Sequence, residues 1–143
     1  MNRKGLLFGV PMLLCLLGVV CLTWAAGEGG IGNEGKGPAL IRAVMCEAIE
    51  DYVPTHTAAA FSIEVGKISC YTSFNHVTDT TYVVHKWYRR DELVTTKRLT
   101  LKPPSWSTYS SIQLREADKG PWRVEVWNAE DQMLRVLRFS VTD

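Results

Sequence analysis

Serine and histidine side chains are the residues of this chain that could carry catalysis, but their spacing does not favour it. An activated nucleophile needs a base within hydrogen-bond reach, and one sign of such a site is a Gly-x-Ser-x-Gly turn. The sequence contains no such turn. Ser105, Ser107, Ser110 and Ser111 instead fall in a stretch that alternates like a β-strand. We therefore predict no catalytic residue and expect the chain not to be an enzyme.

His85 and the acidic residues give equally little support for chemistry. His85 shares a predicted strand face with Trp87, which favours a buried imidazole beside an aromatic ring over a ligand or a pH-sensing group. The acidic residues fall in predicted turns, and a glycosidase would need two of them at one cleft. These turn residues are Asp51, Asp79, Asp91 and Asp118. We predict no cofactor.

The N-terminal residues have the order of an export signal. Arg3 and Lys4 precede an apolar run over residues 6–22, and Ala25 puts a small side chain where a signal peptidase reads. The run is longer than the usual apolar core of a signal, about 7 to 15 residues, and shorter than a membrane span of roughly 20. We expect residues 1–25 to be a cleaved signal peptide, and an uncleaved anchor is the alternative. The product would then be periplasmic or extracellular, or tethered to the membrane.

Two cysteines follow the predicted signal, and they predict a disulfide. Cys46 and Cys70 form an even pair in an exported chain, and such pairs are usually bonded. In the chain-entropy description a bridge of this spacing stabilises a fold by roughly 3 to 4 kcal/mol. Two separate buried thiols are the alternative. A metal site that adds His56 or His76 lacks the close ligand pair of zinc sites, so we predict no metal.

Composition predicts a linker and excludes nucleic acid as a partner. Residues 26–38 are rich in glycine and poor in apolar side chains, which is typical of a flexible linker. The whole chain has 16 basic and 15 acidic residues. With so small a net charge and no basic cluster, the counterion release that drives DNA or RNA binding has no source.

The remaining residues, 39–143, predict one all-β domain. Short runs of β-branched and aromatic residues alternate between two faces and are separated by turn residues. Seven such strands favour an immunoglobulin-like antiparallel sandwich over a closed barrel. The expected strands cover residues 40–49, 67–74, 82–90, 93–101, 106–114, 122–128 and 133–141. The first of them also suits a helical period.

Three aromatic side chains are predicted on the outer side of the sheets. If the alternation holds, Tyr88, Tyr109 and Trp127 point away from the core. Outward aromatic residues can mark a recognition surface for a protein partner or a glycan. Ordinary cross-strand packing with Lys and Arg stems is the alternative.

Three ordered motifs carry a family resemblance. They read His-Lys-Trp-Tyr at residues 85–88, Trp-Ser-Thr-Tyr-Ser-Ser at 106–111 and Gly-Pro-Trp-Arg-Val-Glu-Val at 120–126. With them, the chain from about residue 39 to its end resembles the bacterial envelope proteins grouped as domain of unknown function 2914. The residues that carry the resemblance are His85, Trp87, Trp106, Ser110, Gly120 and Trp122.

The chain departs from that family pattern at two positions. Ser107 stands where arginine is usual, so a role that needs the guanidinium is in doubt. Asp131 stands where a turn glycine is usual, which is tolerable because aspartate visits left-handed backbone conformations. The resemblance implies a place in the envelope and a fold class but no mechanism, since the family has no assigned activity.

Taken together, these patterns predict a non-enzymatic binding module of the bacterial cell envelope. The expected partner is an envelope protein or a polysaccharide. Carbohydrate binding through Tyr88, Tyr109 and Trp127 is the alternative. A membrane would be contacted only through the N-terminal segment.

Overall fold

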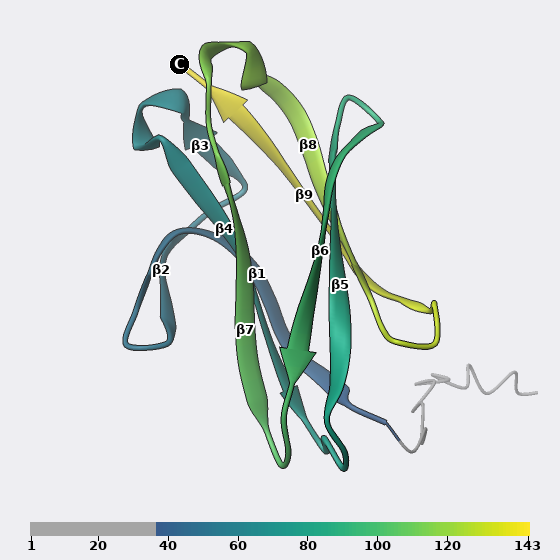
Figure 1. Cartoon of the computed structure of the whole chain (residues 1–143). Coiled ribbons are helices and arrows are strands. Elements are labelled where there is room, and N and C mark those ends of the chain that lie inside the picture. Colours follow the sequence, from purple (N-terminus) through teal and green to yellow (C-terminus); the bar gives the residue numbers. More distant parts are fainter. Residues whose placement is uncertain (1–36) are drawn as a thin grey trace, which may run out of the picture. The chain divides into compact units, whose positions relative to one another are not determined.

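The computed structural model describes residues 37–143, so the predicted signal peptide and residues 26–36 of the predicted linker lie outside the described residues. The described part is an all-β sandwich with two single-turn 3-10 helices (Figure 1). Within it, no helix has the length and apolar character needed to cross a membrane.

Nine strands make up the described part. Their bounds are β1 Ala39–Glu50, β2 Val53–Thr57, β3 Ala60–Ser62, β4 Lys67–Asn75, β5 Thr81–Arg89, β6 Glu92–Leu101, β7 Trp106–Gln113, β8 Gly120–Trp127 and β9 Met133–Thr142. The 3-10 helices are η1 Ile63–Val65 and η2 Glu116–Asp118. All seven expected strands are present, and β1 is a strand rather than a helix.

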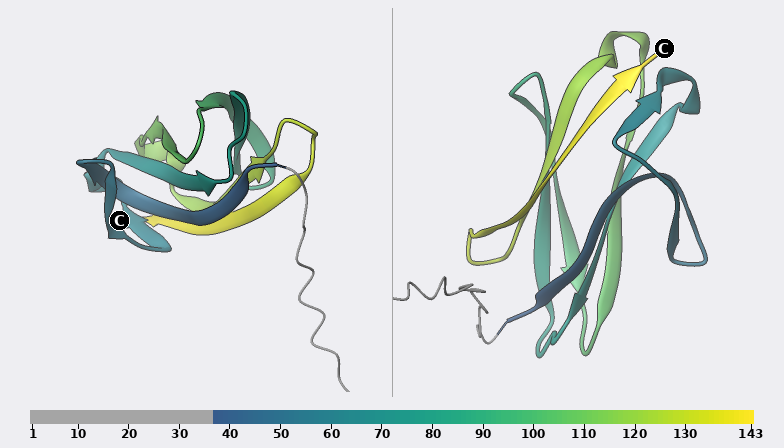
Figure 2. Two further views of the ribbon diagram at one scale, coloured as in Figure 1. Left: turned by 90° about the horizontal axis from the view of Figure 1, so that it is seen from below. Right: turned by 180° about the vertical axis from the view of Figure 1, so that it is seen from behind.

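The strands form two sheets that pack face to face (Figure 2). Sheet 1 has the order β2-β1-β4-β7, and sheet 2 has the order β3-β9-β8-β5-β6. Neighbours are antiparallel except β3 and β9, which are parallel. The orders β1-β4-β7 and β9-β8-β5 are those of strands A-B-E and G-F-C in an immunoglobulin domain, so the predicted fold class is confirmed.

Two strands were missed by the sequence prediction. β2 and β3 lie in residues 53–62, which do not alternate cleanly and contain Pro54. The turn before β2 is tight, since Asp51 and Tyr52 have φ values of 49° and 64°. Two consecutive left-handed residues are the signature of a type I′ hairpin turn.

The core lies between the inner faces of the two sheets, and strand alternation decides which residues fill it. The predicted inward row of β5 is confirmed, because its three members are all 0% exposed. They are Val83, His85 and Trp87. Phe139 of β9 stacks on Trp122 of β8 with ring centroids 6.0 Å apart, and meets the edge of Trp87 at 6.2 Å. Aromatic pairs of this kind add stability beyond the area they bury.

The predicted disulfide is wrong for this structure. Cys46 and Cys70 are both free and buried. They lie on neighbouring strands, but the register sets Cys46 opposite Ser69 and Cys70 opposite Met45. Because successive side chains of a strand point to opposite faces, Cys70 enters the core and Cys46 points to the outer side of sheet 1. A bond between them would require the backbone to move.

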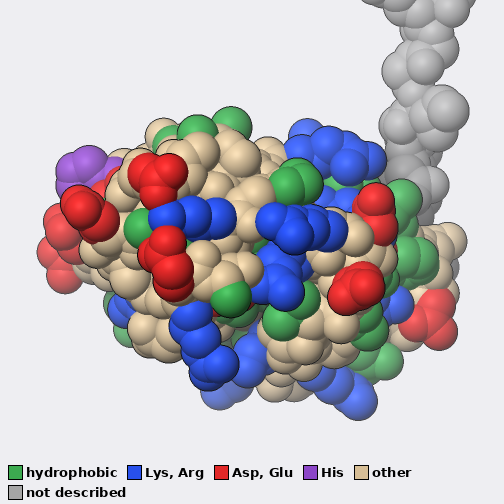
Figure 3. Space-filling model, turned by 90° about the horizontal axis from the view of Figure 1, so that it is seen from above, with side chains coloured by type: hydrophobic (Ala, Val, Ile, Leu, Met, Phe, Trp, Pro, Cys, Tyr) green, Lys and Arg blue, Asp and Glu red, His purple; other side chains and the backbone are tan. Residues whose placement is uncertain are grey.

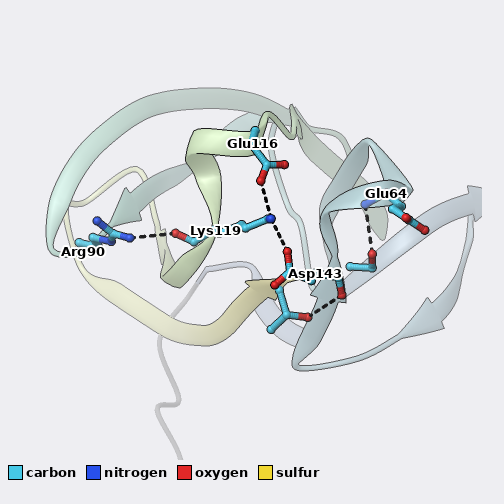
Figure 4. Close-up of polar contacts among 7 residues, drawn as sticks. Glu64, Arg90, Glu116, Lys119 and Asp143 are labelled. Atoms are coloured by element: carbon cyan, nitrogen blue, oxygen red, sulfur yellow. Dashed lines mark hydrogen bonds and ion pairs between the residues drawn. The ribbon is translucent and has the colours of Figure 1, made fainter.

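Polar contacts close one end of the sandwich (Figure 4). Lys119 pairs with Glu116 and with Asp143, and the Arg90 guanidinium donates to the Lys119 carbonyl oxygen at 3.2 Å. Gly120 follows with a φ of 119°, and a Cβ there would meet Arg90 Nε at 3.2 Å. The motif glycine is therefore explained by its backbone conformation and by the arginine packed against it.

Candidate functional site

His85 lies at the centre of a buried polar network that joins the two sheets. Its Nε2 is hydrogen-bonded to Thr72 Oγ1 of β4 at 3.2 Å, and its Nδ1 to Ser110 Oγ of β7 at 2.8 Å. Trp87 Nε1 donates to the same Ser110 Oγ at 3.0 Å. Three of the family-motif residues thus meet at one point, although they come from β5 and β7 in opposite sheets.

This network contains a serine–histidine pair but lacks the features of a nucleophilic site. His85 is 0% exposed and Ser110 is 5% exposed, so a substrate has no direct access to them. Both ring nitrogens are used by hydroxyl groups, which leaves none for an orienting carboxylate. Burial lowers the pKa of His85 to about 4, so the ring is neutral at physiological pH. The network is therefore a structural bridge between the sheets.

The thiols are also poor candidates for chemistry. Burial raises the pKa of Cys46 to about 11, although the nearby Arg42 charge opposes the change. Burial likewise raises the pKa of Cys70, with a smaller contribution from Cys46. Since the thiolate is the reactive form, both cysteines are expected to be inert. Across residues 37–143, no group of three or more His, Cys, Asp or Glu side chains is placed to hold a metal ion.

A groove of about 350 Å³ lies between β1 and β9, and its lining offers little chemistry. Thr57 and Arg138 are its only polar side chains, and the rest of the lining is alanine, valine, methionine and leucine. Ligand sites usually combine apolar walls with several convergent polar groups. The groove lacks such a set.

The outer surface of sheet 2 is different, because cationic side chains stack there on aromatic rings. We call this surface, with its six residues, the cationic face. The pairs are Lys86 with Trp127 at 4.2 Å, Arg123 with Tyr88 at 4.0 Å and Arg98 with Tyr82 at 3.5 Å, from Nζ or Cζ to the ring centroid. The residues come from β5, β6 and β8, which are adjacent in the sheet. Each ring therefore already has a cation against one of its faces.

Glu125 ties one part of the cationic face together. Its Oε1 accepts from Arg123 Nε at 2.9 Å and its Oε2 from Trp127 Nε1 at 3.0 Å, while Arg123 also pairs with Asp91. Burial alone would raise the pKa of Glu125, but these hydrogen bonds and the guanidinium charge together hold it below its ordinary value. The charge of Arg123 is thus largely balanced within the face.

Other cations of sheet 2 have no such balance. In the part of the chain that the structure describes, no ion pair includes Lys86, Arg98 or Arg138. The strands of sheet 2 hold basic residues at Lys86, Arg89, Lys97, Arg98, Arg123, Arg135 and Arg138, and acidic residues at Glu92 and Glu125. The strands of sheet 1 hold Arg42 and Lys67 against Glu47 and Glu50. A nearly neutral chain therefore concentrates positive charge on one sheet.

The end of the sandwich seen in Figure 3 does not share this bias. Acidic and basic side chains are interspersed there. Much of the charge at this end is used internally, as in the contacts of Lys119 with Glu116 and Asp143. The charge distribution therefore supports the cationic face as a binding surface more than it supports the end loops.

The three aromatic residues predicted to point outward do not form one surface. Tyr88 and Trp127 lie on the cationic face, where both are half-buried. Tyr109 is 50% exposed but belongs to β7, in sheet 1. A single platform built from all three is therefore not formed.

Packing of Lys and Arg side chains on these aromatic rings is the alternative that the sequence left open, but the individual pairs were not predicted. Alternation assigned Lys86 to the outer side of β5, but its contact with Trp127 depends on the pairing of β5 with β8. Arg98 reaches Tyr82 only because β6 pairs with β5 in the observed register. A signal was present in the sequence, since basic and aromatic residues share the outward positions of these strands. The strand register that brings each cation to its ring was not predictable from that pattern.

The remaining motif residues also have structural explanations. Trp122 is buried and its Nε1 donates to the Asp118 carbonyl oxygen at 2.6 Å. Trp106 continues the inward row of β7 but is more exposed than expected, because it lies at the end of the sheet. Ser107 accepts a hydrogen bond from Tyr71 at 2.9 Å. Asp131 has a φ of 57°, which confirms the left-handed conformation expected of it.

Comparison with known proteins gives a family but no activity. A family profile described as "Protein of unknown function (DUF2914)" matches residues 80–141, which confirms the predicted resemblance. No curated protein matches the chain. Among solved structures, a mutant beta-glucosidase from Listeria innocua in complex with laminaribiose is similar, with 8% identity over 74% of this chain and a TM-score of 0.40. The chain spans 16% of that protein, and so low a likeness carries no argument.

Proposed function

We propose that this chain, whose residues 80–141 match the profile of the DUF2914 family of unknown function, is a non-enzymatic binding module of the bacterial cell envelope. The observation that carries the proposal is the cationic face. Export of the protein to the periplasm or the cell exterior is part of the proposal, because residues 1–25 have the order of a signal peptide.

The cationic face suits binding because its side chains are held before any partner arrives. Lys86 and Arg123 rest on rings, and Glu125 fixes both Arg123 and Trp127. Side chains that are already ordered lose less conformational entropy on association. An enzyme has less support, since the one Ser–His contact we identify is buried and satisfied within the core.

Photo-crosslinking in living cells tests this proposal. A crosslinking residue at position 127 samples the cationic face, and one at position 109 is the matched control on sheet 1. We expect an adduct from position 127 and little or none from position 109. Mass spectrometry then identifies what is attached. An adduct from position 109 alone, or from neither position, would contradict the proposal.

Carbohydrate binding is the second candidate, and the half-exposed ring of Tyr109 is the observation in its favour. Tyr88 and Trp127 offer less, because a sugar would have to compete with the cations on their faces. Retention on immobilised envelope polysaccharide should then fall in Tyr109→Ala. If that variant is retained like the unmodified chain, and Tyr88→Ala and Trp127→Ala are too, the carbohydrate candidate is wrong.

A further inference from the structure

The free edge of β6 borders the cationic face. β6 is the last strand of sheet 2 and pairs only with β5, so the backbone groups on its other side have no neighbouring strand. Residues 92–98 are exposed except for the half-buried Thr95. An exposed edge of this kind is a template on which an extended polypeptide can add by main-chain hydrogen bonds.

The side chains along this edge change character from one end to the other. β6 begins with the exposed Glu92, and the next two residues, Leu93 and Val94, form an apolar stretch that is 55% and 51% exposed. Lys97 and Arg98 follow at the middle of the same strand and make it basic there, with Arg98 on the cationic face and Lys97 on the opposite face. Lys86 extends the basic region onto β5, where it lies opposite Thr96. The exposed part of this edge therefore offers an apolar stretch, a cationic stretch and a row of backbone groups.

We infer that the partner of the cationic face is an extended acidic polypeptide segment with apolar residues at one end, which adds to sheet 2 beside β6. This rests on the proposed function and names the class of partner. The carboxylates of the segment meet Arg98 and Lys86, which share the outer face of sheet 2. Its apolar residues cover Leu93 and Val94. Charge complementarity of this kind sets the register of a partner and speeds its association.

A second copy of this chain fits the edge poorly. Antiparallel pairing of two β6 strands would bring Lys97 and Arg98 of both copies together on one short edge. Like charges placed opposite one another on neighbouring strands are destabilising, and lysine on an edge strand is a common device against self-pairing. An acidic glycan fits poorly for another reason. It would meet the cations but would use neither the backbone edge nor the apolar end.

Two synthetic peptides and one glycan test the inference on the full chain. The acidic peptide alternates glutamate with threonine and ends in Leu-Val, the control peptide has lysine in place of glutamate, and the glycan is polygalacturonate. Fluorescence anisotropy gives the affinities, and hydrogen exchange reports the β6 amides that do not bond to β5. We expect the acidic peptide to bind, to weaken as salt rises, and to protect those amides.

Matched variants locate the contact. We expect Arg98→Glu to weaken binding of the acidic peptide about tenfold or more, because it reverses a charge at the centre of the proposed contact. Arg42→Glu makes the same charge change on an exposed residue of sheet 1 and should leave the affinity unchanged. Equal losses in the two variants would overturn the inference.

The remaining outcomes of these experiments distinguish the polypeptide from other partners and separate the inference from the proposed function. If polygalacturonate binds as tightly as the acidic peptide and the β6 amides are not protected from exchange, the partner is an acidic glycan and the inference is wrong. If the chain self-associates and this protects the β6 amides, the partner is a second copy of the chain and the inference is wrong. If the acidic peptide fails to bind while position 127 still crosslinks in cells, the inference is wrong and the proposed function stands. If position 127 also gives no adduct, both are wrong.

Discussion

Between the two sheets, His85 is bonded to Thr72 and Ser110, whereas on the outer surface of sheet 2 the cations Lys86 and Arg98 have no acidic partner among the described residues. In the interior of residues 37–143, every buried side-chain nitrogen and oxygen has a hydrogen-bond partner. The interior network is therefore closed and contributes to stability. The cationic face is open, and its unpaired charges are available to a partner.

This difference separates two groups of family-motif positions. His85, Trp87, Ser110 and Trp122 lie in the interior and hold the sandwich together. Tyr88 belongs to the same motif as His85 but points to the cationic face. A change in the first group should alter folding, and a change on the cationic face should alter binding. Each of the following experiments tests this division.

Trp87→Ala should give the largest loss of stability. Trp87 is fully buried, contacts Phe139 and donates to Ser110, so its truncation leaves a large cavity and removes one of the two hydrogen bonds of Ser110 Oγ. We expect the free energy of unfolding to fall by about 3 to 5 kcal/mol. Chemical denaturation measures this. Trp127→Ala is the matched control on the cationic face, and an equal loss there would contradict the division.

Acid should destabilise the fold through His85. Its pKa is about 4 in the folded protein and 6.5 in the unfolded chain, so the unfolded chain binds the proton more readily. The contribution of neutral His85 to the free energy of unfolding is fully present above pH 6.5. It falls by about 3 kcal/mol in total as the pH is lowered from 6.5 towards 4. Denaturation at a series of pH values measures the slope.

His85→Gln is the control for the acid experiment, because it removes the titrating group and should flatten the slope between pH 6.5 and 4. His56 and His76 are exposed and remain in that variant. A slope that survives in His85→Gln would show that other groups cause it.

Ser110→Ala should have an intermediate effect. Ser110 Oγ is bonded to both His85 and Trp87, so its removal leaves two buried groups without this partner. We expect a loss of about 1 to 3 kcal/mol in the free energy of unfolding. Ser107→Ala is the control on the same strand, since Ser107 is bonded to the less deeply placed Tyr71 hydroxyl. The interior assignment fails if Ser107→Ala costs as much.

The contact of Lys86 with Trp127 should contribute little to stability. A double-mutant cycle with Lys86→Ala and Trp127→Ala should give a coupling of about 0.5 to 1 kcal/mol, as is usual for a cation over a ring at a half-exposed site. Thermal unfolding of the four proteins measures it. A coupling of several kcal/mol would mean that the cationic face is part of the folding core.

A reducing agent should have no effect on stability. Cys46 and Cys70 are free thiols, so there is no bond for the reagent to break. The unfolding temperature should be the same with and without dithiothreitol. A lower temperature under reducing conditions would indicate a disulfide between them.

Strand alternation explains why the sequence predicted the faces of the sheets well. Val124 and Val126 are buried as expected, and Arg123 and Glu125, which alternate with them, point outward. The period of two is a local property, and local sequence determines it. The fold class followed because seven such strands must bury their inner rows against one another.

Register between strands is what local sequence does not encode. Cys46 and Cys70 each lie on a strand as expected, but the pairing of β1 with β4 puts them on opposite faces. The stacking of Arg98 on Tyr82 likewise depends on how β6 pairs with β5. Such contacts arise from long-range pairing. The sequence could therefore predict that a residue points outward but not which side chain it meets.

The most direct test of the cationic face combines crosslinking with charge reversal. A crosslinking residue at position 127 would be placed in living cells in three backgrounds: the unmodified chain, Arg98→Glu and Arg42→Glu. If the cationic face binds the partner, the adduct from position 127 should disappear in Arg98→Glu and persist in Arg42→Glu. An adduct that persists unchanged in Arg98→Glu would contradict the account.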